Sequence, residues 1–210
     1  MGFPVLIIGE SGSGKSYSIK NLDSEKVGIF SVEKNRLPFQ KQFKIVKNAT
    51  YKQIHQALSN PTLKQYVIDD STFLIINQVF DRAKEVGYSK FTDMAKEFRD
   101  LIHFVNKNLP DDVIVYFMHH IENVPNTGKI KVKTAGKMLD DVLDVPSCFD
   151  VVLLAQVENK EHCFITQSDG YTPAKSPEGM FDYIIPNDLN IVDTRIREFY
   201  NLNNNKKEEK

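Results

Sequence analysis

The segment GESGSGKSYS at residues 9–18 constrains the fold and chemistry of this chain more than any other part of the sequence. Gly9 is followed by four residues and then by Gly14-Lys15-Ser16, which is the spacing of a phosphate-binding loop (P-loop). A tight loop that leads into a helix turns successive backbone N–H groups inward, and the helix start adds positive partial charge. The candidate nucleotide-binding residues are Gly9, Glu10, Ser11, Gly12, Ser13, Gly14, Lys15, Ser16 and Tyr17.

Two side chains of this loop have distinct roles in the motif. Lys15 can reach the β and γ phosphates of a nucleotide, and the Ser16 hydroxyl can bind Mg²⁺. The motif also lies between a predicted strand at residues 3–8 and a predicted helix at residues 15–22, which is the context that it requires. The alternative is a plain turn rich in glycine and serine, but we expect ATP and Mg²⁺ as cofactors.

Apolar runs and helical periodicity divide the chain into alternating strands and helices. Strands are predicted at residues 3–8, 27–32, 44–47, 66–68 and 113–118, and a hairpin at 151–157 and 162–166. Helices are predicted at residues 15–22, 51–58, 73–86, 92–108 and 188–200. Such alternation is typical of an α/β fold with a mostly parallel central sheet covered on both faces. We therefore predict a three-layer P-loop NTPase fold with a β-hairpin and a helix at the C-terminal end.

Length and composition fit one domain with a core of ordinary size. We expect a single domain over residues 1–202 of the 210, followed by a disordered polar tail over 203–210. The net charge of −1 gives no global attraction for nucleic acid or for an anionic membrane surface. Cys148 and Cys163 lack metal-type spacing, and no apolar run approaches the roughly 18 residues that span a bilayer. We expect a cytoplasmic protein without membrane contact.

Acidic and histidine residues stand where predicted strands end. They are Glu33, Asp69, Asp70, His119 and His120. In a largely parallel sheet, ligands bind beyond the carboxyl ends of the strands. The sequence therefore predicts that these side chains gather at the same edge as the glycine-rich loop.

The acids suit a hydrolysis site. An NTPase needs a carboxylate near Mg²⁺ and often a second one that orients or deprotonates the attacking water. Asp69 or Asp70 would supply the first carboxylate, and the pattern leaves open which one faces the metal. The alternative is that one of them caps the following helix. Glu33 is the candidate base, and its alternative is an ordinary loop glutamate.

The order of these features resembles the core of RecA-like ATPases over about residues 3–157. IFSVEKNRL is similar to the segment that carries the catalytic glutamate of that family, and YVIDDSTFLI is similar to the segment of the metal-site aspartate. The second likeness places Asp70-Ser71 on the family's Asp-Ser. The chain also resembles small phage-encoded P-loop ATPases, including RecA-like single-strand annealing proteins, through GKMLDDVLDVPSCFDVVLL and AKSPEGMFDYIIPNDL.

The resemblance implies an ATPase of DNA recombination or replication that binds single-stranded DNA and assembles as a homo-oligomer. It implies that His119 or His120 senses the γ-phosphate, whereas the alternative is a structural histidine. It also implies that Lys137 or Lys175 could reach the γ-phosphate of a neighbouring subunit. If the chain is phage-encoded, the expected location is the host cytoplasm.

A segment without acids, residues 123–139, is the candidate DNA contact. It carries Lys129, Lys131, Lys133 and Lys137, and its position resembles the mobile DNA-contacting loops of RecA-like proteins. Lysines hold phosphates without reading sequence, but this segment lacks the aromatic side chains that stack on single-stranded bases. The alternative is a solvated surface loop.

Two other functions remain open. A nucleoside or nucleotide kinase also carries a P-loop, but such a kinase usually needs an arginine-bearing lid, and residues 123–139 contain no arginine. A nucleotide-dependent switch of the helicase-loader type would instead respond to a protein partner. Glu33 on a second strand favours the ATPase over the kinase.

Overall fold

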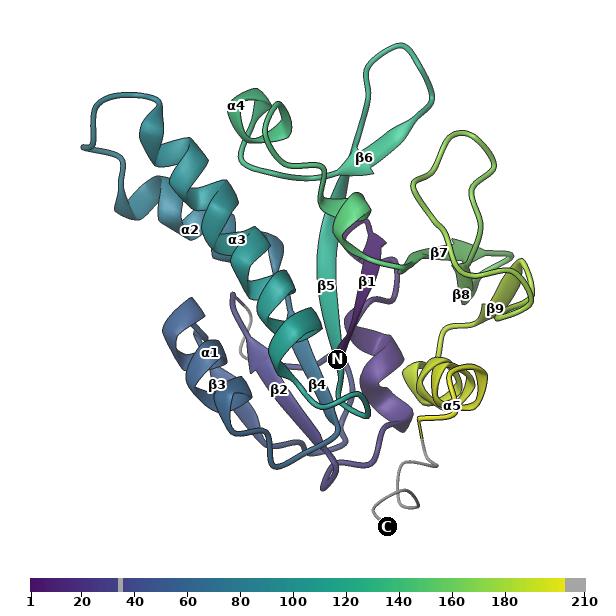
Figure 1. Cartoon of the computed structure of the whole chain (residues 1–210). Coiled ribbons are helices and arrows are strands. Elements are labelled where there is room, and N and C mark those ends of the chain that lie inside the picture. Colours follow the sequence, from purple (N-terminus) through teal and green to yellow (C-terminus); the bar gives the residue numbers. More distant parts are fainter. Residues whose placement is uncertain (34–35, 203–210) are drawn as a thin grey trace.

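A nine-stranded sheet organises the chain, and the computed structural model describes residues 1–33 and 36–202. The strand order is β3-β2-β4-β5-β1-β7-β8-β9, and β6 pairs with β5 (Figure 1). The strands are β1 (Phe3–Gly9), β2 (Val27–Ser31), β3 (Ile45–Lys47), β4 (Gln65–Asp69), β5 (Ile114–Asn123), β6 (Ile130–Val132), β7 (Val151–Glu158), β8 (Glu161–Ile165) and β9 (Ile184–Pro186). The predicted tail at 203–210 lies outside the described residues.

The sheet is mixed but mostly parallel, so the prediction of an α/β fold is confirmed. Strands β3, β2, β4, β5, β1 and β7 all run parallel to one another. Strands β8 and β9 are antiparallel, as β6 is to β5. The predicted hairpin is therefore β7–β8, and its first strand belongs to the parallel part of the sheet. The parallel strands are apolar almost throughout because both of their faces are covered.

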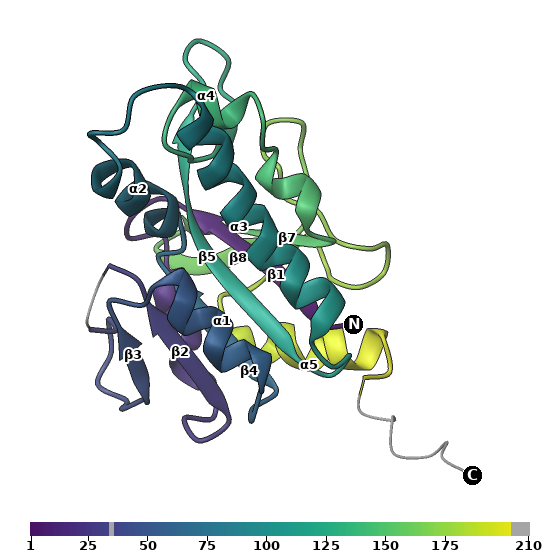
Figure 2. The ribbon, with the colours of Figure 1, turned by 60° about the vertical axis from the view of Figure 1, so that its left-hand side comes forward.

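Helices cover both faces of the sheet (Figures 1 and 2). The helices are α1 (Tyr51–Ser59), α2 (Thr72–Asp81), α3 (Ser89–Asn108), α4 (Lys137–Asp140) and α5 (Leu189–Phe199), with 3₁₀ helices η1 (Ser16–Asn21) and η2 (Val145–Cys148). Leu6 and Ile8 of β1 point into the core beneath α1, α2 and α3. Val5 and Ile7 point into a second core beneath η1 and α5, as the two-residue period of a strand requires.

Several boundaries differ from the prediction. The helix expected at 15–22 is the short 3₁₀ helix η1, where the Ser18 hydroxyl donates to the Lys15 carbonyl oxygen at 2.6 Å. Serine that bonds back to the local backbone in this way competes with regular α-helical bonds. The helix expected at 73–86 ends at Asp81, and α3 begins three residues before the expected Thr92. Strands β6 and β9 and helix α4 were not predicted, because each has only three or four residues.

A buried polar network ties α5 to the sheet. The Tyr116 hydroxyl donates to Asp193 Oδ1 at 2.9 Å, and Arg197 Nε donates to Asp193 Oδ2 at 2.6 Å. Arg197 also donates to the Asp112 carbonyl oxygen at 2.8 Å. Within the described part of the chain, no helix is long and apolar enough to cross a membrane.

Replacing Asp193 with alanine should lower the free energy of unfolding by about 3–5 kcal/mol, because it leaves a buried guanidinium without its carboxylate. Urea unfolding of Asp193→Ala and of the wild type measures this change. The matched control is Asp100→Ala, which removes an exposed ion pair with Lys96 and should cost less than about 1 kcal/mol. Equal losses in the two variants would contradict a stabilising role for the network.

Candidate functional site

The glycine-rich loop, residues 9–16, joins the end of β1 to η1. Gly12 and Gly14 have φ angles of +83° and +103°, a region that side chains other than glycine rarely adopt. A Cβ atom on Gly14 would also come within 2.7 Å of the His162 ring. Backbone conformation therefore favours glycine at both positions, and at Gly14 the space beside His162 requires it as well.

Lys15 and Ser16 make the contacts that define the site. Lys15 is 6% exposed, and its ammonium donates to the carbonyl oxygens of Gly9 and Glu10 at 2.7 and 2.8 Å. Ser16 Oγ donates to Asp69 Oδ1 at 2.7 Å. The fold thus brings a cation and a hydroxyl–carboxylate pair to the mouth of the loop.

The two neighbouring aspartates point to different partners. Asp69 ends β4 and contacts Ser16, whereas Asp70 has a φ of +58° and its Oδ1 lies 3.2 Å from His120 Nε2. Aspartate tolerates this left-handed conformation better than most residues. Neither aspartate occupies the N-cap of α2, which is Ser71. The Ser16 contact favours Asp69 as the metal-side carboxylate, rather than the Asp70 that the family resemblance suggested.

Oxygen atoms of this kind fit Mg²⁺. Mg²⁺ usually keeps several waters and is held by one or two carboxylates together with substrate phosphates. Ser16 and Asp69 would supply the protein oxygens. Among residues 1–33 and 36–202, no group of three or more His, Cys, Asp or Glu side chains is arranged to hold a metal ion by itself. Any metal here would therefore depend on ligand oxygens.

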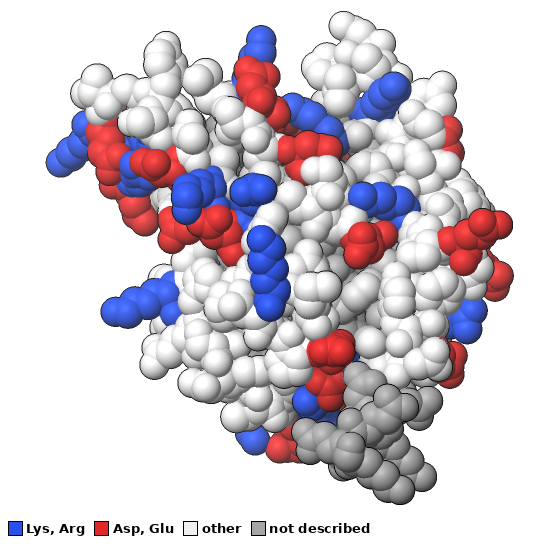
Figure 3. Space-filling model, viewed as in Figure 1, with Lys and Arg blue, Asp and Glu red and all other residues white. Residues whose placement is uncertain are grey.

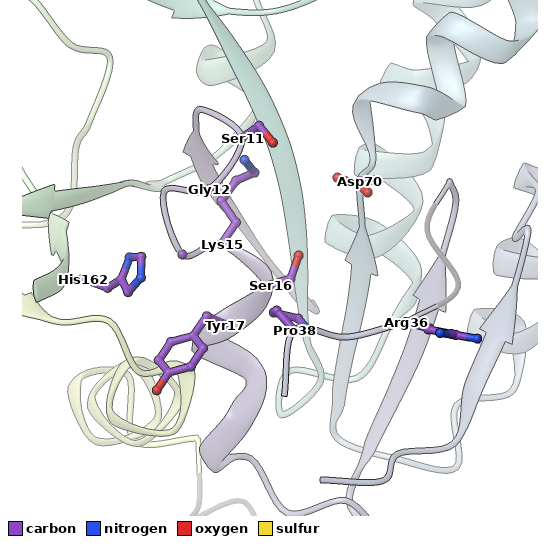
Figure 4. Close-up of a pocket in the computed structure, with 10 residues that line it drawn as sticks. Ser11, Gly12, Lys15, Ser16, Tyr17, Arg36, Pro38, Asp70 and His162 are labelled. Carbon is purple, nitrogen blue, oxygen red and sulfur yellow. The ribbon is translucent and has the colours of Figure 1, made fainter. Parts of the chain in front are cut away.

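A pocket of about 480 Å³ opens over the loop (Figure 4). Its lining residues are Ser11, Gly12, Gly14, Lys15, Ser16, Tyr17, Arg36, Pro38, Asp70 and His162. Ligand pockets in proteins span about 300–1,000 Å³, so the volume suits a small molecule. Gly9, Glu10 and Ser13 are not among the lining residues, although Gly9 and Glu10 hold Lys15 through their carbonyl oxygens.

Three lining residues were missed by sequence reasoning. They are Arg36, Pro38 and His162. His162 belongs to β8, and its Nδ1–H donates to the Ser13 carbonyl oxygen at 3.0 Å across a separation of 149 residues. No sequence signal indicates such a contact, because it exists only once β8 joins the sheet. Arg36 lies outside the basic segments, and its position five residues beyond the end of β2 gave no sign of a role.

The two histidines expected just after residue 118 lie within β5, which continues to Asn123, and they occupy different environments. His119 is fully buried, with Nε2 2.8 Å from the Lys133 carbonyl oxygen and Nδ1 3.0 Å from the Ser71 hydroxyl. Because a carbonyl only accepts, the proton is on Nε2. Burial lowers the pKa of His119 to about 3. His119 thus links β5 to the end of β6 and the start of α2. His120 instead contacts Asp70, which lines the pocket. The geometry therefore favours His120 for a role with the ligand.

The buried neutral His119 should make folding stability depend on pH. Its folded pKa lies below the usual value of about 6.5, so the unfolded chain binds more protons between those values and stability falls as pH drops through that range. The expected slope is up to about 1.4 kcal/mol per pH unit. Urea unfolding from pH 7 to 5 would measure it, with His119→Gln as comparison. Equal slopes in the two proteins would contradict this assignment.

Glu33 lies close to the same edge of the sheet but outside the pocket lining. It is exposed and follows β2, whose Ser31 pairs with Asp69 in the sheet. Its predicted role as the base that activates water stays a prediction.

The candidate DNA segment is a β-ribbon and a short helix, not one open loop. Lys129, Lys133 and Lys137 are exposed. Lys131 pairs with Glu122 at 2.9 Å and with Asp140, and these carboxylates raise its pKa. In the view of Figure 3, positive and negative side chains are interspersed over this face. The acids that flank the segment thus offset part of its charge.

Lys175 is not brought to the pocket. Its backbone N–H donates to the Val152 carbonyl oxygen at 2.9 Å, and Val152 pairs with Leu6 in the middle of β1. The predicted action of Lys175 or Lys137 on a neighbouring subunit stays a prediction.

No protein-family model matches the sequence, and no curated protein matches it significantly. The site must therefore be interpreted from its own residues.

Proposed function

We propose that this protein is a Mg²⁺-dependent ATPase with a P-loop NTPase core of the RecA-like type. The observation that carries the proposal is the 2.7 Å contact between Ser16 Oγ and Asp69 Oδ1. It joins the serine of a G-x₄-G-K-S loop to an acid at the end of a different buried strand. This pairing is what a Mg·nucleotide site needs, and a plain structural turn would not need it.

The arrangement of strands supports the same proposal. Strands β1, β5 and β4 are neighbours in the sheet and run parallel. The carboxyl ends of β1 and β4 therefore bring the glycine-rich loop and the two aspartates to one edge, where His120 of β5 pairs with Gly9. Ligands of open α/β sheets bind at such an edge.

Each residue has a defined task in ATP hydrolysis. Backbone N–H groups of the loop and the Lys15 ammonium would hold the phosphates, and Ser16 and Asp69 would hold Mg²⁺. Bound Mg²⁺ would neutralise charge on the β and γ phosphates. The oxygen of water forms a bond to the γ phosphorus, and the bond from that phosphorus to the β–γ bridging oxygen breaks. Glu33 would take the proton of the water, and His120 with Asp70 would orient groups near the γ-phosphate.

Phosphate release from ATP, measured with Mg²⁺ and with excess EDTA, tests the proposal. Release that requires Mg²⁺ supports it. Transfer of the phosphoryl group to an added nucleoside or nucleotide, without release of phosphate, would indicate a kinase instead. Turnover that appears only with a protein partner would indicate a loader-type switch.

Single-stranded DNA is the proposed partner of the ATPase, and the exposed lysines of the β5–β6 ribbon support it. Lys129 and Lys133 are exposed, and among the described residues neither forms an ion pair like those of Lys131 with Glu122 and Asp140. Assembly into a homo-oligomer also belongs to this proposal, and a native-mass measurement would test it.

Changing Lys129 and Lys133 together to alanine should weaken single-stranded DNA binding and lower its log–log salt slope by about 1.4, since each phosphate contact on a single strand contributes about 0.7. Fluorescence anisotropy at several salt concentrations measures both quantities. Lys47→Ala with Lys52→Ala is the matched control, because both lysines are exposed on β3 and α1. An unchanged slope in the first variant would remove the ribbon from the DNA interface.

A further inference from the structure

The pocket over the glycine-rich loop has two chemically different ends. Figure 4 shows Tyr17 and His162 on one side of Lys15 and Ser16, and Asp70 and Arg36 on the other. One end thus offers aromatic rings and the other offers charges. A nucleoside triphosphate has the same division, with an aromatic base at one end and charged phosphates at the other.

The charged end must receive the terminal phosphates. Ser16 and Asp69 would hold Mg²⁺, which would supply positive charge beside the terminal phosphates. Asp70, whose carboxylate lies 3.2 Å from His120, lines the end of the pocket away from the rings. The rest of the nucleotide must therefore extend toward Tyr17.

The aromatic end is held in place before any ligand arrives. The rings of Tyr17 and His162 are 5.5 Å apart and tilted by 35°, and Phe39 packs edge-on against Tyr17 at 6.5 Å. The bond from His162 to the Ser13 carbonyl oxygen fixes the imidazole over the loop. Lys20 Nζ lies 5.1 Å from the centre of the Tyr17 ring and donates to its hydroxyl at 3.1 Å, and the tyrosine is still 36% exposed, so part of its surface is open to a ligand. Asp70 is the only carboxylate among the described lining residues, and it lies at the other end.

We infer that the base of the nucleotide stacks at the Tyr17–His162 pair, so that β8 contributes a base-binding residue to the site. This inference rests on the proposed function. Stacking on an aromatic ring tolerates different bases because every base has a π face. The larger ring system of a purine gains more contact there than a pyrimidine.

Calorimetric titration with Mg·ATP and with Mg·tripolyphosphate distinguishes the contributions of the two ends of the pocket to binding affinity. Tripolyphosphate has the phosphate chain but no base. Tyr17→Ala should weaken ATP binding at least about fivefold, because base stacking contributes about 1–3 kcal/mol, and should leave tripolyphosphate binding unchanged. His162→Ala should also weaken ATP binding, and Tyr17→Phe should weaken it less than Tyr17→Ala does because the aromatic ring remains. Tyr183→Ala, at an exposed tyrosine outside the pocket lining, is the matched control.

The outcomes distinguish this inference from the proposed function. Equal weakening of both ligands by Tyr17→Ala, or no weakening of either, would overturn the base site while the ATPase proposal stands. A wild-type protein that binds neither ligand would overturn both.

Discussion

Replacing Lys15 with alanine should reduce ATP turnover at least about 100-fold, because the loss of one preorganised charge on the transferred phosphate typically costs 10²–10³ in rate. The Lys15 ammonium lies within 2.8 Å of two loop carbonyl oxygens and is nearly buried, so no other described lysine of the loop can replace it. Phosphate release at saturating Mg·ATP measures the effect.

The matched control for this change is Lys26→Ala. Lys26 is an exposed lysine that pairs with Asp23 on the surface, and its loss should leave turnover unchanged. Circular dichroism of Lys15→Ala would show whether the fold is retained, since the ammonium also joins the two ends of the loop. Wild-type turnover in a folded Lys15→Ala protein would exclude the loop from the reaction.

Asp69→Asn should raise the Mg²⁺ concentration for half-maximal turnover at least about tenfold, because a neutral amide is a weaker ligand than a carboxylate for this hard cation. Asp70→Asn should leave that concentration unchanged, since the Asp70 carboxylate lies 3.2 Å from His120 Nε2 whereas the Asp69 carboxylate accepts from Ser16 Oγ. Turnover measured across a Mg²⁺ titration compares the two isosteric variants directly.

The opposite result would reverse the assignment. If Asp70→Asn raised the Mg²⁺ requirement and Asp69→Asn did not, the metal-side acid would be the one that the RecA-like resemblance indicates. The Ser16–Asp69 contact would then be a feature of the ligand-free loop only.

The main features of the fold could be predicted because they depend on local pattern. The buried strands at residues 3–8 and 113–118 are long apolar runs, and the structure has β1 and β5 there. Short strands such as β6 and β9 have three residues each, too few for a periodic signal. They form because β5 and β8 offer them an edge to pair with.

The site was predictable only where a motif encodes it. Lys15 and Ser16 follow from the loop spacing, and the acids follow from the ends of the strands. The choice between Asp69 and Asp70 depends on a left-handed backbone angle at Asp70, which the sequence pattern does not indicate. His162 reaches the loop through tertiary pairing of β7 and β8, so no local pattern could assign it.

The charge of the basic segment was overestimated from the sequence, again because tertiary contacts decide which residues lie together. Residues 123–139 contain no acid, but Glu122 and Asp140 stand immediately outside that window. The antiparallel pairing of β6 with β5 sets Lys131 opposite Glu122, and α4 brings Asp140 to the same ammonium. The electrostatic potential around a segment thus depends on the charged side chains that lie near it in the folded chain, as well as on its own residues.

The most direct test of the central claim is the binding of Mg·ATP to the wild-type protein, measured by isothermal titration calorimetry beside Lys15→Ala. The account predicts saturable binding of one nucleotide per chain that Mg²⁺ strengthens and that Lys15→Ala lacks. Absence of binding to the wild type, or equal binding to both proteins, would contradict it.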